Sequence, residues 1–293
     1  MQAVLLSDRG VVKVDGDDAR KFLNGLITAD MGAVTSTQAR YAALLTPQGK
    51  IIADFMVAEA ADGRFLLDCA RPAATVLAER LSFYKLRAKV TVEDISGTLG
   101  VLAVWGGDRA PAQGHCYRDP RLEALGLRCL LPPVQAGEAA AGLGAVLADT
   151  ADYEAHRIAL GVPSGGADFR YGDAFPHEAD MDQLRGVDFD KGCFVGQEVV
   201  SRMEHRGIAR TRIVPLAYTG TAPQAGAPIM AGDKSVGAMG SAAAGRGLAT
   251  VRIDRVDEAL AAGLALDADG TPIELIKPNW IRFAFPGEKA AEP

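Results

Sequence analysis

The segment richest in reactive groups is Lys191-Gly192-Cys193-Phe194-Val195-Gly196-Gln197-Glu198. It places a thiol two residues from a lysine, and a nearby ammonium favours the thiolate, the form that attacks electrophiles and binds metals. The two flanking glycines let the backbone approach a ligand closely, and the last two residues add an amide and a carboxylate. We therefore predict a functional thiol at Cys193. The competing interpretation is a buried, inert cysteine in a glycine-rich turn.

A basic stripe follows directly. Between Ser201 and Arg212 the chain has four arginines and one glutamate, and Arg202, Arg206 and Arg210 recur every four residues. That spacing places side chains on one face of a helix. Such a face can bind anions, whereas the alternative is a set of surface ion pairs that each contribute less than about 1 kcal/mol.

Composition limits the function classes. The chain has 293 residues, 48% hydrophobic and 23% charged, which is typical of a soluble globular protein long enough for two domains. Its net charge of −6 disfavours a protein that coats nucleic acid. No apolar stretch approaches the roughly 20 residues that span a bilayer, so we predict no membrane partner and regard nucleic acid as an unfavourable one.

Four cysteines are present, but none forms a CxxC pair and no Cys/His grouping has zinc spacing. We therefore predict no permanently bound metal, and we assign Cys69, Cys116 and Cys129 structural roles. The N-terminus lacks a basic region followed by an apolar run, so no signal or transit peptide is expected. These features favour a reduced cytoplasmic protein, or one of the mitochondrial matrix if the source is eukaryotic.

The first half predicts an antiparallel α+β layer. Strands are expected over 1–14, 51–60, 64–69 and 89–94, with one helix after Asp18 and another that opens at Pro72. Strands joined by short turns with few helices favour α+β over a doubly wound sheet. No GxGxxG follows a strand, so a dinucleotide fold has no support. One strand is also expected at 127–131, and a helix at 152–160.

The second half of the sequence contains two segments with different patterns. Residues 162–191 are irregular and rich in Gly, Asp and Pro, and such a long irregular stretch is often functional. After Arg212 short apolar runs, the last of them 280–285, alternate with Gly/Pro turns, which predicts a small β-barrel or sandwich interrupted by a helix at 255–262. We expect domains over 1–210 and 211–286, and a disordered tail over 287–293.

The octapeptide around Cys193 resembles the signature of the YgfZ branch of the glycine-cleavage T-protein superfamily. Shorter similarities occur in the expected order, at 22–30, 47–55, 119–128, 154–163, 176–178 and 247–252. The octapeptide is specific, and each other piece is weak by itself. The resemblance implies a T-protein-like fold: two intertwined ferredoxin-like α+β subdomains around a central folate pocket, plus a C-terminal β-barrel.

The same resemblance implies a tetrahydrofolate-binding factor that assists assembly or repair of iron–sulfur proteins through transient contacts with client or assembly proteins. A pterin needs carboxylates or amides and the glutamate tail of a folate needs cations, in a mostly apolar pocket. The expected folate-binding residues are Asp54, Arg128, Arg157, Glu178, Lys191, Gly192, Gly196, Gln197, Glu198, Arg202 and Arg206.

Two other functions remain open. A folate-dependent aminomethyltransferase or demethylase fits the superfamily, but true aminomethyltransferases carry two successive aspartates where this chain has Ala53-Asp54. Alanine cannot replace an orienting carboxylate, so we predict that aminomethyl transfer is lost. An RNA-binding protein related to tRNA modification would use Arg202, Arg206, Arg210 and Arg212, against the acidic net charge.

Overall fold

The computed structural model describes residues 1–207 and 209–288, which fall into two compact units. Unit 1 comprises Met1–Tyr153 and Leu184–Val199. Unit 2 comprises Glu154–Gln183 and the chain from Val200 onward. These units do not follow the predicted domains, because residues 154–183 group with the C-terminal part. The boundary near residue 210 stays a prediction.

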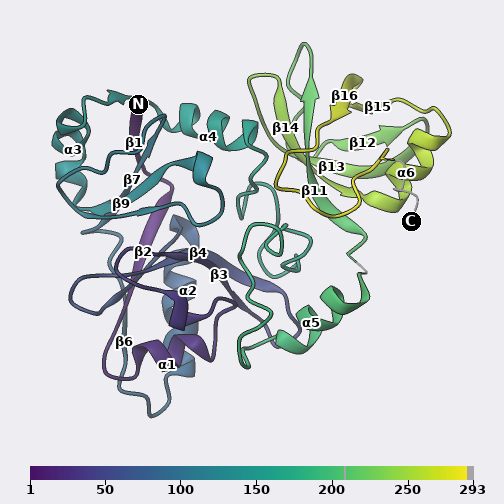
Figure 1. Ribbon diagram of the computed structural model, residues 1–293. Helices are drawn as coiled ribbons and strands as arrows, with labels where there is room; N and C mark the ends of the chain where they lie inside the picture. Colours follow the sequence, from purple (N-terminus) through teal and green to yellow (C-terminus); the bar gives the residue numbers. More distant parts are fainter. Residues whose placement is uncertain (208, 289–293) are drawn as a thin grey trace. The chain divides into compact units, whose positions relative to one another are not determined.

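Unit 1 contains two five-stranded sheets (Figure 1). The first has the order β10-β1-β7-β9-β8, and every neighbouring pair is antiparallel except β1 with β10. Its strands are β1 (Gln2–Leu6), β7 (Gly100–Trp105), β8 (His115–Arg118), β9 (Leu127–Leu131) and β10 (Val146–Leu147). The second has the order β3-β4-β5-β2-β6 and is antiparallel throughout. Its strands are β2 (Arg9–Asp15), β3 (Arg40–Leu45), β4 (Ile51–Glu59), β5 (Phe65–Ala70) and β6 (Thr91–Asp94).

Short helices accompany these sheets: α1 (Ala19–Asn24), α2 (Arg71–Tyr84) and α3 (Ala136–Gly142). Helix α2 begins where proline occupies its first turn, a position at which the missing N–H costs nothing. It buries one face formed by Ala73, Ala74, Leu77, Ala78 and Leu81, and it packs on the second sheet. Helices α4 (Thr150–Ala159) and α5 (Gln197–Arg206) follow later in the chain.

A group of four buried charges and the partly buried Arg9, here called the charge cluster, lies between the two sheets of unit 1. Its members are Arg9, Asp68, Asp119, Arg121 and Arg128. Arg9 and Asp68 belong to β2 and β5 of the second sheet, and their Nε and Oδ1 atoms are 2.7 Å apart. Arg128, on β9 of the first sheet, donates from Nε to Asp68 Oδ2 at 2.6 Å. One carboxylate therefore joins both sheets.

Burial alone would raise the pKa of Asp68, but Arg128 and Arg9 outweigh it and hold that pKa below its usual value. The pKa of Asp119 is lowered in the same way, with Arg121 and Arg128 overcoming burial. A carboxylate with a lowered folded-state pKa stabilises the fold above its unfolded-state pKa. That stabilisation is lost as the pH falls through the folded-state pKa.

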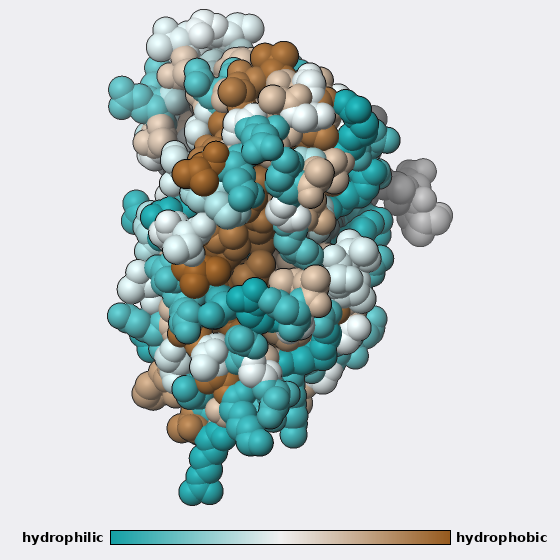
Figure 2. All heavy atoms as spheres, turned by 90° about the vertical axis from the view of Figure 1, so that its left-hand side faces the viewer, coloured by the Kyte–Doolittle hydropathy of each residue, from teal (hydrophilic) through white to brown (hydrophobic). Residues whose placement is uncertain are grey.

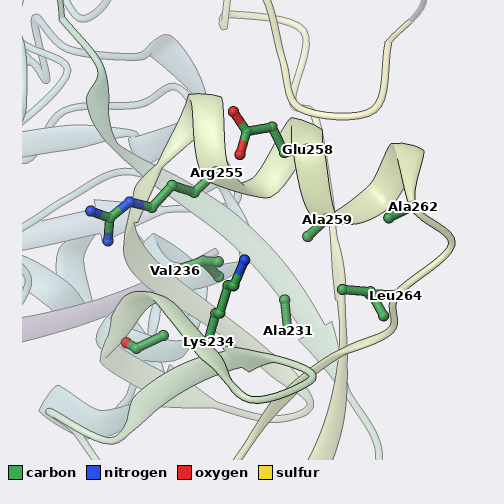
Figure 3. A pocket seen from close by; sticks show the side chains of 9 residues that line it. Ala231, Lys234, Val236, Arg255, Glu258, Ala259, Ala262 and Leu264 are labelled. Atoms are coloured by element: carbon green, nitrogen blue, oxygen red, sulfur yellow. The ribbon is translucent and has the colours of Figure 1, made fainter.

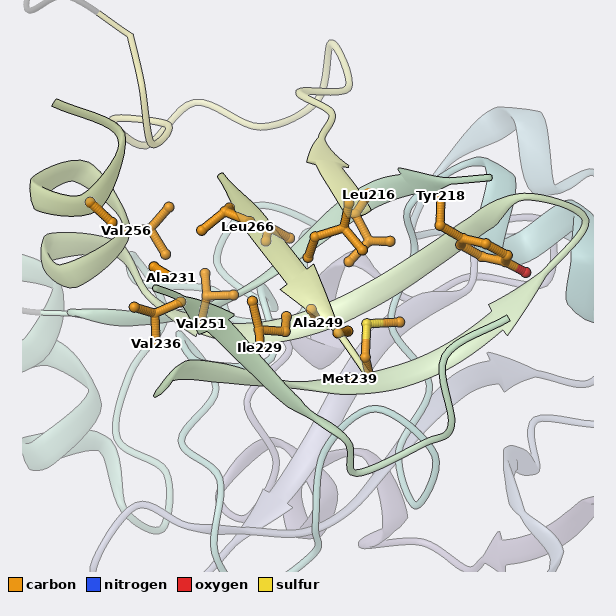
Figure 4. Packing of buried hydrophobic residues seen from close by; sticks show 14 of the residues in the cluster. Leu216, Tyr218, Ile229, Ala231, Val236, Met239, Ala249, Val251, Val256 and Leu266 are labelled. Carbon is orange, nitrogen blue, oxygen red and sulfur yellow. The ribbon is translucent and has the colours of Figure 1, made fainter. Parts of the chain in front are cut away.

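Unit 2 contains an irregular stretch before α5 and a closed barrel of order β11-β14-β13-β12-β15-β16. The barrel strands are β11 (Thr211–Tyr218), β12 (Pro228–Ala231), β13 (Lys234–Ala243), β14 (Arg246–Arg252), β15 (Leu266–Ala268) and β16 (Thr271–Leu275). Helix α6 (Ile253–Ala261) follows β14. Aliphatic side chains such as Leu216, Ile229 and Val251 fill the interior (Figure 4).

The predicted α+β class and the C-terminal barrel are confirmed. The interpretation of 280–285 as a strand is wrong, because these residues form no strand although Ile281 and Phe285 pack in the barrel core. The expectation of reduced cysteines also fails for Cys116 and Cys129, which form a disulfide between directly paired positions of β8 and β9. Of the predicted tail, residues 289–293 lie outside the described residues.

On the face shown in Figure 2, hydrophilic side chains dominate and apolar ones gather in separate patches. Among the described residues, no helix is both long and apolar enough to cross a membrane.

Replacing Asp68 with alanine removes the carboxylate that both Arg9 and Arg128 use. Because the buried Arg128 then loses its nearest carboxylate and the partly buried Arg9 loses its ion pair, we expect the free energy of unfolding to fall by about 3–5 kcal/mol in a urea titration. The control is Asp62→Ala, whose partner Arg64 is exposed, with an expected loss below about 1 kcal/mol. Equal losses in the two variants would contradict a sheet-joining role for Asp68.

Candidate functional site

The loop that carries Cys193 lies in unit 1, after a turn held by Asp188. Asp188 Oδ1 accepts the N–H groups of Asp190 and Lys191 at 3.0 and 3.2 Å. Cys193 is exposed and forms no disulfide, whereas the next residue, Phe194, is buried. The alternative of a buried Cys193 is therefore wrong, and its role as a functional thiol stays a prediction.

The side chain of Lys191 donates hydrogen bonds to backbone carbonyl groups. Its Nζ donates to the carbonyl oxygens of Asn24, Ile27 and Ala29 at 2.7, 2.8 and 2.8 Å, just beyond the end of α1. Burial lowers the pKa of Lys191 to about 8, although Asp30 and Asp188 oppose this shift. The ammonium is therefore mostly protonated at neutral pH, with its three N–H bonds all in use. Lys191 therefore anchors the loop to the end of α1. Its predicted effect on the thiol of Cys193 and its predicted contact with folate stay predictions.

The two glycines of the segment differ. Gly196 has φ +82°, and a Cβ there would lie 2.6 Å from the carbonyl oxygen of Thr46 and 3.1 Å from Cα of Gly49. Only glycine fits so close to the turn between β3 and β4. A Cβ on Gly192 would meet nothing within 4 Å, so packing does not require glycine at that position.

Helix α5 begins at Gln197, whose N–H donates to the carbonyl oxygen of Phe194 at 3.2 Å. Glu198, Arg202 and Arg206 are exposed along this helix. Helix α5 thus carries Arg202 and Arg206 of the predicted stripe but ends at Arg206, so Arg210 lies beyond the helix although it is exposed. Arg212, the fourth arginine of this stretch, is buried.

Asp54 is buried on β4 and accepts a hydrogen bond from Tyr41 Oη at 2.9 Å. Burial, with Asp54 nearby, raises the pKa of Tyr41 well above its usual value. The guanidinium of Arg121 lies 5.7 Å from the centre of the Tyr41 ring, which connects Asp54 to the charge cluster. In that cluster Arg128 Nη2 is buried and has no hydrogen-bond partner among the described residues.

Arg157 does not suit the predicted role of binding a folate tail. Its Nε and Nη2 donate to Glu154, its Nη1 donates to the Val162 carbonyl and to Asp168, and Nη2 also reaches Ser241. All five N–H groups are engaged within unit 2, and the residue is 2% exposed. We therefore correct its assignment to a structural one.

Glu178 also makes a local contact, since its Oε2 accepts the N–H of Phe175 at 2.9 Å.

Cys69 is a buried cysteine of β5. Burial raises the pKa of Cys69 to about 12 and thereby keeps it a thiol. The structural role predicted for Cys69 agrees with this placement.

Sequence reasoning missed a polar group in unit 2, here called the His177 group: His177, Asp180, Asp182, Glu204 and Arg212. His177 Nε2 and Glu204 Oε2 are 2.9 Å apart, and Arg212 bonds Asp182 through both terminal nitrogens at 2.6 and 2.9 Å. Burial raises the pKa of Asp180 well above its usual value despite Arg212. The available signal was the density of acidic residues after Pro176-His177-Glu178.

A separate pocket of about 460 Å³ lies on the barrel beside α6 (Figure 3). Lys234, Arg255 and Glu258 surround its apolar floor. No residue predicted to act in the site lines this pocket.

Comparison with known proteins shows which domain families match this chain. Residues 5–111 match the GCVT N-terminal domain, and residues 210–283 match the C-terminal β-barrel domain of CAF17. The human iron–sulfur cluster assembly factor IBA57, mitochondrial, is 34% identical over 244 residues, which cover 75% of this chain and 67% of that protein. The chain belongs to the IBA57 family.

One further relative and one solved structure are also similar to this chain. A homologue of the IBA57 assembly factor from Mycosarcoma maydis, also named mitochondrial, is 36% identical over 234 residues, or 74% of this chain and 58% of that protein. The chain thus spans little more than half of this fungal relative. The crystal structure of glycine cleavage system aminomethyltransferase T from Bartonella henselae superposes with a TM-score of 0.76 at 18% identity, covering 97% of this chain and 87% of that one. That likeness establishes the T-protein-like fold.

Within this IBA57-family chain, Lys191→Met should release the loop from α1. Three backbone carbonyls lose a charged donor, so we expect the free energy of unfolding to fall by about 1.5–3 kcal/mol in chemical denaturation. Lys21→Met, at an exposed position of α1, is the matched control and should change it by less than about 0.5 kcal/mol. A Lys191 variant as stable as the Lys21 variant would refute the anchor.

Proposed function

We propose that this chain is a tetrahydrofolate-binding factor that assists assembly or repair of iron–sulfur proteins, with Cys193 as its functional thiol. The observation that carries the proposal is the exposed, unpaired Cys193 in a loop anchored by Lys191. Its relatives named above are iron–sulfur cluster assembly factors. An exposed thiol can reach a client or assembly protein transiently, without entering a pocket.

The octapeptide supports a finer assignment to the YgfZ branch. A cytoplasmic location stays part of the proposal for a bacterial source. The mitochondrial names of the relatives favour the matrix for a eukaryotic one.

Folate binding draws support from residues of unit 1. Asp54 supplies a buried carboxylate for the N–H groups of a pterin, and Arg128 Nη2 supplies a buried donor without a partner among the described residues. These groups fit the polar edge of a pterin, so we propose that both contact the ligand. Glu178, Arg202 and Arg206 remain predicted folate residues, as do Gly192, Gly196, Gln197 and Glu198 of the loop.

The alternatives fit the structure less well. Ala53 is buried on β4, where it pairs with Leu44, and it supplies no carboxylate at the position of the missing aspartate. The RNA-binding alternative would use Arg212, but this arginine is engaged in ion pairs with Asp182 and Asp180. We therefore do not propose aminomethyl transfer or RNA binding.

The thiol is tested by complementation of a strain that lacks its own member of the family. We expect Cys193→Ala to fold, because the residue is exposed, and to leave the activity of an iron–sulfur enzyme at the level of the deletion strain. Asp190→Ala is the loop control and should restore activity, since its side chain is exposed and Asp190 is not among the predicted site residues. Full rescue by Cys193→Ala would remove Cys193 from the proposal.

Folate binding is tested by calorimetric titration with 5-formyltetrahydrofolate. Asp54→Asn keeps the shape of the side chain but removes its charge, so we expect binding to weaken by at least about tenfold. Asp62→Asn, in an exposed turn, should bind like the wild type. Unchanged binding by Asp54→Asn would exclude Asp54 from the site, and no binding by the wild type would exclude folate.

A further inference from the structure

We propose that His177, Asp182 and Glu204 form a binding site for a divalent transition-metal cation. One ligand atom from each residue lies within 4.8 Å of the other two. The sequence predicted no bound metal because no Cys/His grouping has zinc spacing. These three ligands are brought together only by folding, from a turn, an irregular segment and α5.

The contact between His177 and Glu204 has the separation of neighbouring ligands. Two atoms bound at about 2.1 Å, and at right angles around one cation, are about 3 Å apart. Nε2 of His177 and Oε2 of Glu204 are 2.9 Å apart. The side chain of Glu204 is 45% exposed, so it has room to rotate as a cation enters between the two groups.

The carboxylate of Asp182 is oriented by hydrogen bonds from neighbouring side chains. Arg212 donates to both of its oxygens, and Gln183 Nε2 donates to Oδ2 at 2.6 Å. A carboxylate offers about four lone-pair positions, so these bonds leave acceptor capacity for a metal. Hydrogen bonds from a second layer of residues are what orient ligating carboxylates in metal sites. Arg212 also offsets one of the two negative charges that the ligands bring together.

A second observation points to a ligand at this place. Asp180 is fully buried, and its Oδ2 has no hydrogen-bond partner among the described residues. Its Oδ1 is 3.5 Å from Arg212 Nη1, the same nitrogen that binds Asp182 at 2.6 Å. A buried polar atom without a partner destabilises the fold. Water bound to a cation supplies such a donor.

The ligands also face open space. A pocket of about 340 Å³ is lined by His177 and Glu204, with Met203, Ile253 and Phe283 among its other walls. It leaves coordination positions for water or for a small ligand. One imidazole with two carboxylates favours Zn²⁺, Fe²⁺, Co²⁺ or Mn²⁺, whereas Ca²⁺ and Mg²⁺ prefer sites made of oxygen alone.

The test is titration of the full chain with Co²⁺, followed by calorimetry and by the visible absorption of the bound ion. We expect one ion per chain and a new absorption band in the wild type. His177→Ala and Glu204→Gln should each weaken binding by at least about tenfold. His205→Ala, next to Glu204 but exposed and outside the triad, is the matched control and should bind within about twofold of the wild type.

Binding that is unchanged in Glu204→Gln, or absent from the wild type, would overturn the site. Glu204 is largely exposed, so its variant should fold even if His177→Ala does not. The folate titration and the Cys193 complementation depend on residues of unit 1. Failure of the metal site is therefore distinguishable from failure of the proposed function.

Discussion

The buried carboxylate of Asp68 is the contact on which the architecture of unit 1 depends. It accepts from Arg9 within its own sheet and from Arg128 in the other sheet, and Tyr117 Oη lies 3.3 Å from it. A buried ion pair contributes little net stability compared with a well-packed apolar pair, but removal of one partner is costly. The cluster therefore restricts how the two sheets can pack: an arrangement that separates Asp68 from Arg128 breaks the shortest ion pair of both groups, and leaves Arg128 only its longer contact of 3.5 Å with Asp119 within the cluster.

That restriction extends to the candidate folate residues. Asp119 holds Arg121 through two bonds, at 3.0 and 2.7 Å, and Arg121 lies over the ring of Tyr41, which in turn binds Asp54. Asp54 is thus positioned by a chain of contacts that begins between the sheets. Polar groups in such a chain are rigid when every member is satisfied. The exception is Arg128 Nη2, and an incompletely satisfied donor in a rigid setting is what a ligand-binding site requires.

Local patterns predicted the local structure well. The strand expected at 127–131 was found at Leu127–Leu131, and the proline at 72 marked the first turn of α2. What local patterns did not show was which distant groups certain charged side chains contact. Lys191 was considered as a cation for its near neighbour Cys193, and the structure shows that its hydrogen-bond partners are carbonyls 162 to 167 residues away. Arg157 was taken as a ligand-binding cation because composition cannot show that Asp168 and Ser241 would occupy it. Charge and spacing identify a candidate residue, but only folding decides its partner.

The loop around Cys193 shows how an exposed thiol can be held in place by anchors on both sides of it. Lys191 fixes one side through three carbonyls, and Gly196 fixes the other through its close approach to the turn at Thr46 and Gly49. Phe194 is buried between these anchors. The freedom left to Cys193 is therefore small, although it is exposed, and the entropy lost when a partner binds it is correspondingly small. An enclosed pocket would serve a small substrate, whereas a thiol presented at the surface on a fixed loop suits an encounter with another protein. Under the proposed function, this geometry favours a thiol that meets a folded client over group transfer within a closed site.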